Sequence, residues 1–123
     1  MSTILIIEDE KMLAEMYRDK FEGSGHETDL VFSSEEAFDY LKEKKPDLIL
    51  LDILLPQENG IAFLKKIKEL KMAEGIPIVA FSNYDDPKTK KEALDLGAKI
   101  YLIKTRFTPT DLLAEIEKFL PQN

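Results

Sequence analysis

The chain has 123 residues, of which 44% are hydrophobic and 33% charged, so it can form one domain with a real core. Its net charge of −7 argues against direct binding to nucleic acid or to anionic membranes. The absence of cysteine excludes a disulfide framework, a thiolate zinc site and a cysteine nucleophile. No apolar run is long enough to span a bilayer and the start has no signal-peptide pattern, so we expect a cytoplasmic protein without membrane insertion.

Short apolar runs alternate with segments of helical periodicity along the whole chain. Strands are predicted over residues 3–7, 26–32, 47–52, 76–82 and 99–104. Helices are predicted within residues 9–23, 33–46, 59–71, 86–97 and 108–120. Strict alternation predicts parallel strands joined by right-handed crossovers. The expected fold is therefore an α/β doubly wound, five-stranded parallel sheet with five helices on its two faces. A flavodoxin-like strand order 2-1-3-4-5 would make the first, third, fourth and fifth strands neighbours.

Local signals mark where the helices begin and which of their side chains face inward. Residues with helix-starting patterns are Ser33 with Glu36 as a capping box, Asn59, Asp86 before Pro87, and Thr108 before Pro109. Apolar residues at helical spacing in the first helix are Met12, Leu13, Met16, Tyr17 and Phe21. Residues that we expect the last helix to bury are Leu112, Leu113, Ile116, Phe119 and Leu120.

Polar residues end four of the five predicted strands: Glu8 and Asp9, then Asp52, Ser82 and Lys104. In a doubly wound sheet such residues meet at the carboxyl edge, where ligands bind. Three carboxylates repel one another unless a cation or protons intervene, and an all-oxygen set suits Mg²⁺. A metal, an ammonium and a hydroxyl around one carboxylate indicate phosphoryl transfer with Asp52 as the nucleophile. Taken singly, each of these residues would more often be a loop residue or a helix cap.

The chain resembles a response-regulator receiver domain of two-component signalling, of the chemotaxis-type, single-domain kind. The resemblance covers residues 1–123 as one receiver domain with no effector domain. The motifs that carry it are "ILIIEDE", "PDLILLDILLPQENG", "VAFS" and "YLIK". It implies that the protein catalyses its own aspartyl phosphorylation and dephosphorylation and is not an enzyme in the usual sense.

The resemblance also assigns roles to residues at the carboxyl edge. Asp52 would accept a phosphoryl group from a phosphohistidine on a sensor histidine kinase or a histidine phosphotransfer protein. Mg²⁺ (or Mn²⁺) would be held by Asp9, Asp52 and the backbone carbonyl of Leu54, with Glu8 acting through a bound water. Lys104 would pair with the phosphoryl group.

A switch is implied by the same resemblance. Ser82 would hydrogen-bond the phosphoryl group, and Tyr101 would move inward with it, although a half-buried aromatic residue has a purely structural reading too. The surface of the fourth helix, fifth strand and fifth helix would then contact a downstream effector, which the sequence does not identify.

Two departures from the family pattern and one pair of bulky residues modulate this expectation. Thr105 stands where the family usually has a proline after a cis bond. We therefore predict that the bond between Lys104 and Thr105 is trans or else visibly strained, and that the loop to Pro109 differs from the family norm. Asn83 stands where the family favours a small residue, and it would either narrow access to the site or hydrogen-bond the phosphoryl group. Leu54 and Tyr84 flank the approach of the attacking water, which predicts slow loss of the phosphoryl group.

Other functions compete with a phosphoacceptor domain. One alternative is a phosphorylation-independent receiver-like protein-interaction module, which the two departures favour. An aspartate-nucleophile phosphatase would carry a second aspartate where this chain has Leu54. A flavodoxin-type flavin binder would carry a phosphate-binding loop where this chain has the acidic "EDEKM". The intact set of Asp52, Ser82 and Lys104 favours the phosphoacceptor.

Overall fold

The computed structural model describes residues 2–55 and 58–121, and in this part of the chain five strands alternate with five α-helices. The strands are β1 (Thr3–Ile7), β2 (Glu27–Val31), β3 (Leu48–Asp52), β4 (Ile78–Ser82) and β5 (Ala98–Ile103). The helices are α1 (Lys11–Gly23), α2 (Ser34–Glu43), α3 (Gly60–Glu69), α4 (Pro87–Asp95) and α5 (Pro109–Glu117). A short 3-10 helix, η1 (Lys104–Arg106), follows β5.

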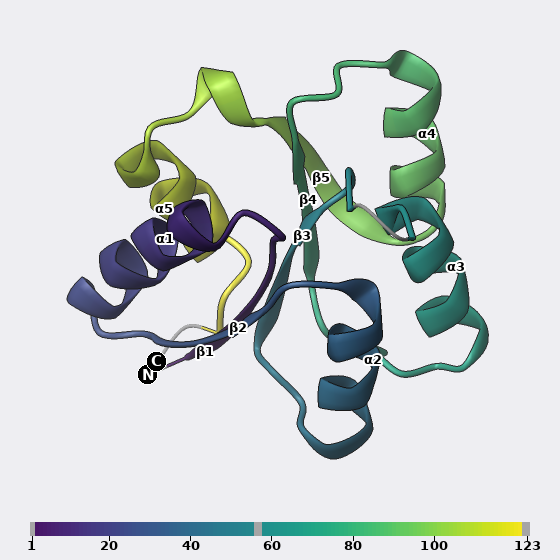
Figure 1. The fold of residues 1–123 in the computed structure, drawn as a ribbon, viewed down its shortest axis with the longest axis horizontal. Coiled ribbons are helices and arrows are strands. Elements are labelled where there is room, and N and C mark those ends of the chain that lie inside the picture. The colour runs from purple at the N-terminus through teal and green to yellow at the C-terminus, as the bar shows by residue number, and fades with distance from the viewer. Residues whose placement is uncertain (1, 56–57, 122–123) are drawn as a thin grey trace.

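The strands form one parallel sheet in the order β2-β1-β3-β4-β5, which confirms the predicted fold and strand order. Helices α1 and α5 cover one face and α2, α3 and α4 cover the other (Figure 1). The pairing register places Asp52 opposite Phe81, and Ser82 opposite Ile103. The carboxyl ends of β3, β4 and β5 therefore finish at the same edge of the sheet.

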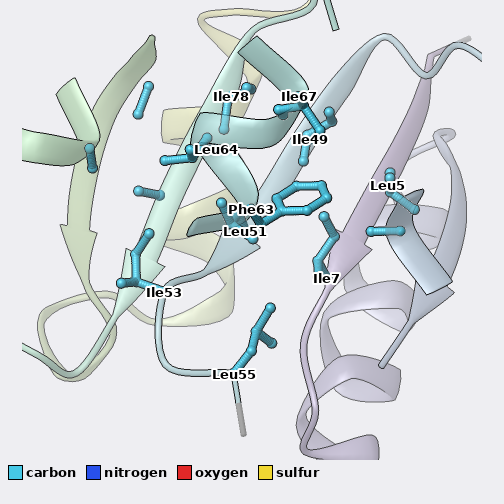
Figure 2. Packing of buried hydrophobic residues seen from close by; sticks show 14 of the residues in the cluster. Leu5, Ile7, Ile49, Leu51, Ile53, Leu55, Phe63, Leu64, Ile67 and Ile78 are labelled. Atoms are coloured by element: carbon cyan, nitrogen blue, oxygen red, sulfur yellow. The ribbon is translucent and has the colours of Figure 1, made fainter. Parts of the chain in front are cut away.

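Alternating side chains of each central strand fill two separate hydrophobic clusters. In β3, Ile49 and Leu51 pack with α2, α3 and α4, whereas Leu48 and Leu50 pack with α1 and α5. Figure 2 shows the first cluster, in which Phe63 and Leu64 of α3 lie against side chains of β1 and β3. Because β1, β3 and β4 are buried on both faces, they need nearly continuous apolar sequence, and these apolar runs indicated them in the sequence.

Side-chain caps begin four of the helices at the residues that the sequence indicated. The hydroxyl of Thr108 accepts a hydrogen bond from the amide of Asp111. The Asp111 carboxylate in turn accepts a hydrogen bond from the Thr108 amide, which completes a capping box. Ser33 accepts from the Glu36 amide at 3.1 Å, but the Glu36 carboxylate accepts from the amide of Phe32. Asn59 and Asp86 cap α3 and α4 in the same way, through the amides of Ala62 and Thr89.

Some predicted inward positions differ from the structure. Met12 is 87% exposed and Met16 is 42% exposed, because α1 buries only a narrow stripe that contains Ala14, Tyr17 and Phe21. Phe119 is half-buried, since α5 ends at Glu117 and the chain turns there. The role expected for Pro56 lies outside the described residues.

Helix α4 is the helix with the least buried surface in the described fold. Ala93 is its one buried residue, whereas α3 buries four residues, three of them large. Its remaining side chains are polar or face solvent, and several are charged. Helix α4 therefore buries one apolar side chain, that of Ala93.

Candidate functional site at the carboxyl edge of the sheet

The structure brings Glu8, Asp52, Ser82 and Lys104 to the carboxyl edge of the sheet, where β1, β3, β4 and β5 end. Strand β2 adds a backbone group: the carbonyl of Val31 accepts a hydrogen bond from the amide of Glu8 at 3.1 Å. Asp52 lies at the edge of the core and not inside it, because it is the last residue of the central strand β3. The sequence expectation for the position of these residues is confirmed by the fold.

Lys104 forms ion pairs with two buried carboxylates at this edge. Its ammonium group donates to Glu8 and also to Oδ2 of Asp52 at 3.0 Å. The side chains are nearly inaccessible, with 3% of Glu8, 6% of Asp52 and 11% of Lys104 exposed. The ring of Phe81 lies under the ammonium group at 5.6 Å from its centre. The sequence analysis did not single out Phe81. Its position opposite Asp52, in the neighbouring strand β4, is what indicates a place at this site.

Burial dominates the acidity of this cluster. It raises the pKa of Glu8 to about 7, although the hydrogen bond from Lys104 works in the opposite direction. Burial also raises the pKa of Asp52, against the lowering effect of the Lys104 charge and the Leu54 amide. Burial alone would lower the pKa of Lys104, but its bond to Glu8 and the charge of Asp52 raise it. Protons are therefore held at this site more tightly than on exposed carboxylates.

Glu8, Asp9 and Asp52 form an acidic cluster compatible with a divalent metal ion. One oxygen from each carboxylate lies within 4.8 Å of the others. Asp9 is exposed, whereas the other two are buried, so the cluster opens toward solvent on the Asp9 side. When all three carboxylates are ionised, Lys104 balances one of three negative charges, and the remaining two match a divalent cation. The all-oxygen donor set suits a hard ion such as Mg²⁺.

The chain leaving β3 is held close to Asp52. The amide of Leu54 donates to Oδ1 of Asp52 at 3.0 Å, and the amide of Gly60 donates to the carbonyl of Ile53 at 2.7 Å. A Cβ atom at Gly60 would lie 2.8 Å from the Cα of Ile53, so only glycine fits at this start of α3. These contacts hold the start of α3 against the end of β3.

The main chain of Tyr84 connects Ser82 with Tyr101. The fully buried Ser82 accepts a hydrogen bond from the Tyr84 amide at 3.0 Å, and the Tyr101 hydroxyl donates to the Tyr84 carbonyl at 2.6 Å. Tyr101 is 6% exposed, so its ring lies inward in this structure. Sequence analysis singled out the side chain of Tyr84, and the structure shows that the backbone makes these contacts.

The expected modulating residues lie around the mouth of the site. Leu54 and Tyr84 are 49% and 47% exposed, and Asn83 is exposed on the loop after β4. Thr105 lies in the 3-10 helix, and its bond to Lys104 is trans, as predicted.

The sequence analysis missed one ion pair between two of these loops. Arg106 pairs with Asp85 at 2.9 Å and joins the loops that follow β4 and β5. No sequence pattern connects two such distant loop residues.

This chain is similar to known proteins in both sequence and fold. The chain matches the model of the response regulator receiver domain over residues 4–117. The chain belongs to the response regulator receiver domain family. The receiver fold is shared with a two-component response regulator from Clostridium difficile, which is 29% identical, has a TM-score of 0.88, and is matched over 97% of this chain and 95% of that one. The Francisella response regulator 1452 receiver domain is 27% identical, with a TM-score of 0.87 and coverage of 97% and 96%.

Curated relatives of this receiver are longer proteins. The transcriptional regulatory protein DltR of Streptococcus agalactiae is 34% identical over 92% of this chain and 49% of its own length. The phosphate regulon transcriptional regulatory protein PhoB of Pseudomonas aeruginosa is 33% identical over 96% of this chain and 51% of its own length. The chain thus spans about half the length of these relatives. Among the described residues, no helix combines the length and hydropathy needed to cross a membrane.

Proposed function

We propose that this receiver domain accepts a phosphoryl group on Asp52 from a phosphohistidine of a sensor histidine kinase or histidine phosphotransfer protein. The observation that carries the proposal is the position of the Asp52 carboxylate at the end of β3. It lies within an acidic cluster and in contact with Lys104. A cytoplasmic location belongs to the same proposal, because such a donor acts there.

Metal binding is proposed at the acidic cluster. Asp9, Asp52 and the Leu54 carbonyl would hold Mg²⁺ or Mn²⁺, and Glu8 would act through a bound water. When bound, the ion neutralises charge on the phosphoryl oxygens. The two negative charges that Lys104 leaves unbalanced support this assignment.

The chemical step is a displacement at phosphorus. An oxygen of the Asp52 carboxylate forms a bond to phosphorus while the bond from phosphorus to the histidine nitrogen breaks. The amide of Leu54 orients the carboxylate, and the ammonium group of Lys104 offsets the charge of the transferred group. Hydrolysis of the aspartyl phosphate by water returns Asp52 to its free carboxylate.

Signalling is proposed to run through Ser82 and Tyr101. A phosphoryl group on Asp52 adds negative charge and acceptor oxygens, which attract the Ser82 hydroxyl away from the Tyr84 amide. Because the Tyr84 carbonyl also holds the Tyr101 hydroxyl, the loop after β4 and the face of α4, β5 and α5 respond together. That face would contact the effector. The chain's net charge of −7 makes DNA itself a poor partner for this domain.

Intact-mass measurement after incubation with acetyl phosphate and Mg²⁺ tests the proposal. We expect a phosphoryl adduct that is absent in Asp52→Asn and after removal of metal with EDTA. Asp19→Asn, an exposed carboxylate on α1, is the matched control and keeps the adduct. A folded wild-type protein that forms no adduct contradicts the proposal and favours a phosphorylation-independent interaction module. Thr105 and Asn83, which depart from the family pattern, give that alternative its standing.

A further inference from the structure

A cavity of about 480 Å³ lies at the amino edge of the sheet, at the opposite end of β4 from Ser82. It is lined by the end of α3, the turn into β4, the turn between α4 and β5, and the residue Phe119 beyond α5, and it opens to solvent. Its volume lies within the range that encloses drug-sized molecules. None of its lining residues belongs to the acidic cluster, so it is a separate site.

The interior of this amino-edge cavity is apolar. Ile67, Ile76, Leu96 and Phe119 line it and bring together the margins of both hydrophobic clusters. All but Ile67 are only half-buried, so apolar surface stays available inside the cavity. An apolar ring or chain would gain favourable burial there.

Two glycines keep the cavity open. Gly75 and Gly97 line it in left-handed conformations, with φ of +78° and +112°. Nothing lies within 4 Å of the position that a Cβ atom would take at either residue. Because these turns disfavour residues with side chains, the space above them is not filled by the chain itself.

Lysines surround the opening. The ammonium group of Lys68 donates to the carbonyl of Asp95 and so caps the end of α4. Lys71 and Lys99 also line the cavity, and within residues 2–55 and 58–121 neither ammonium group pairs with a carboxylate. Lys99 lies at a register shift between β4 and β5, which removes it from the regular strand pairing. Two cations are therefore available to a ligand.

The local charge favours an anion although the whole chain is acidic. The charged residues of the lining are the three lysines Lys68, Lys71 and Lys99 and the one acidic residue Glu74, so the lining carries a positive net charge. Glu74 lines the cavity too, but it is exposed on the turn and its charge is screened by solvent.

We propose that the amino-edge cavity binds a small organic anion with an apolar body and one carboxylate, sulfonate or phosphate group. The apolar body would occupy the space lined by Ile76, Leu96 and Phe119. The anionic group would lie at the opening, between Lys71 and Lys99. The site is independent of the phosphoacceptor chemistry proposed for Asp52.

The probe for this site is 8-anilinonaphthalene-1-sulfonate, which combines an aromatic body with one sulfonate. Titration calorimetry on the wild-type chain is expected to show saturable binding of one probe per chain. Amide chemical-shift changes in a titration followed by NMR should cluster in residues 67–78 and 96–99. N-phenyl-1-naphthylamine, the uncharged analogue, should bind at least about tenfold more weakly because it lacks the charged contacts.

Variants separate the charge from the apolar space. The double variant Lys71→Gln/Lys99→Gln should weaken probe binding by about tenfold or more, whereas Lys65→Gln, an exposed lysine outside the lining, should leave it unchanged. Ala73→Leu narrows the cavity with both lysines intact and should also weaken binding. Glu74→Gln should tighten it. Each variant should keep the acetyl phosphate adduct of the wild type, because none of these residues lies at the Asp52 site.

Three results would overturn the inference. The first is equal affinity for the charged probe and its uncharged analogue. The second is unchanged affinity in the double lysine variant. The third is a set of NMR shifts at the exposed apolar residues Met12, Leu54 and Tyr84 in place of the amino edge. Failure of the adduct assay in the wild type would concern the phosphoacceptor proposal alone.

Discussion

Replacement of Gly60 by alanine tests the close packing between the start of α3 and the end of β3. The added Cβ atom would lie 2.8 Å from the Cα of Ile53 and 3.1 Å from the carbonyl oxygen of Asp52. Both are backbone atoms, so no flexible side chain can move aside. The 2.8 Å separation is about 0.6 Å short of an ordinary contact, so α3 or β3 must shift.

The expected loss of stability has three parts. Overpacking against a rigid neighbour costs about 1–3 kcal/mol. Strain on the 2.7 Å bond from the Gly60 amide to the Ile53 carbonyl removes up to about 1 kcal/mol. Alanine restricts the unfolded chain and returns about 0.4–1 kcal/mol. We therefore expect the free energy of unfolding to fall by about 1–3 kcal/mol.

Urea unfolding followed by circular dichroism measures this change. A loss of about 2 kcal/mol lowers the midpoint by about 1 M for an m-value near 2 kcal/mol/M. Gly23→Ala is the matched control: it ends α1, has nothing within 4 Å of its Cβ position, and should leave stability within about 0.5 kcal/mol or raise it. Equal midpoints for Gly60→Ala and the wild type would show that the contact with Ile53 is easily relieved and would refute the reasoning.

Three further predictions concern the site. Lys104→Met in EDTA should destabilise the protein more at pH about 8 than at pH about 5.5, because the pKa of Glu8, about 7 with the lysine present, rises further without it. Protonation of Glu8 at the lower pH then removes one of the two buried charges that have lost their partner, and an equal loss at both pH values in urea unfolding would contradict this. Saturating Mg²⁺, at about 100 times its Kd, should stabilise the wild type by about 2.7 kcal/mol in thermal unfolding. The variant Asp9→Asn should be stabilised by clearly less, and equal stabilisation of both proteins would argue against metal ligation by Asp9. Tyr84→Ala should hasten loss of the phosphoryl group in time-resolved intact-mass measurements while the backbone bonds at residue 84 persist, and an unchanged rate would remove the shielding role.

The sequence predicted the arrangement of the sheet because its strands are short apolar runs bounded by charged residues. Strand β1 has the predicted limits. The limits of the other strands differ by one or two residues, because flanking residues such as His26 and Ile76 lie outside the strand pairing. The gathering of Glu8, Asp52, Ser82 and Lys104 followed from topology alone, since parallel strands in this order bring those ends together.

Other features needed the three-dimensional contacts. The inward stripe of α1 excludes Met12 and Met16, because the helix has several apolar residues and only packing decides which of them face the sheet. The bonds of the Tyr84 main chain leave no trace in residue identity, since any residue offers the same amide and carbonyl. The closeness of Gly60 to Ile53 depends on how α3 meets β3, which a cap signal at Asn59 does not specify.

The sparse anchoring of α4 has a consequence for how the fold opens. Segments that bury little apolar surface have small local unfolding free energies, so α4 should exchange its amide hydrogens faster than α3. A loosely held element can be displaced by a small free-energy change, whereas α3 would need the disruption of Phe63 and Leu64 as well. Helix α4, which forms part of the proposed effector face, is thus the helix that a modest signal can move while the rest of the fold stays packed.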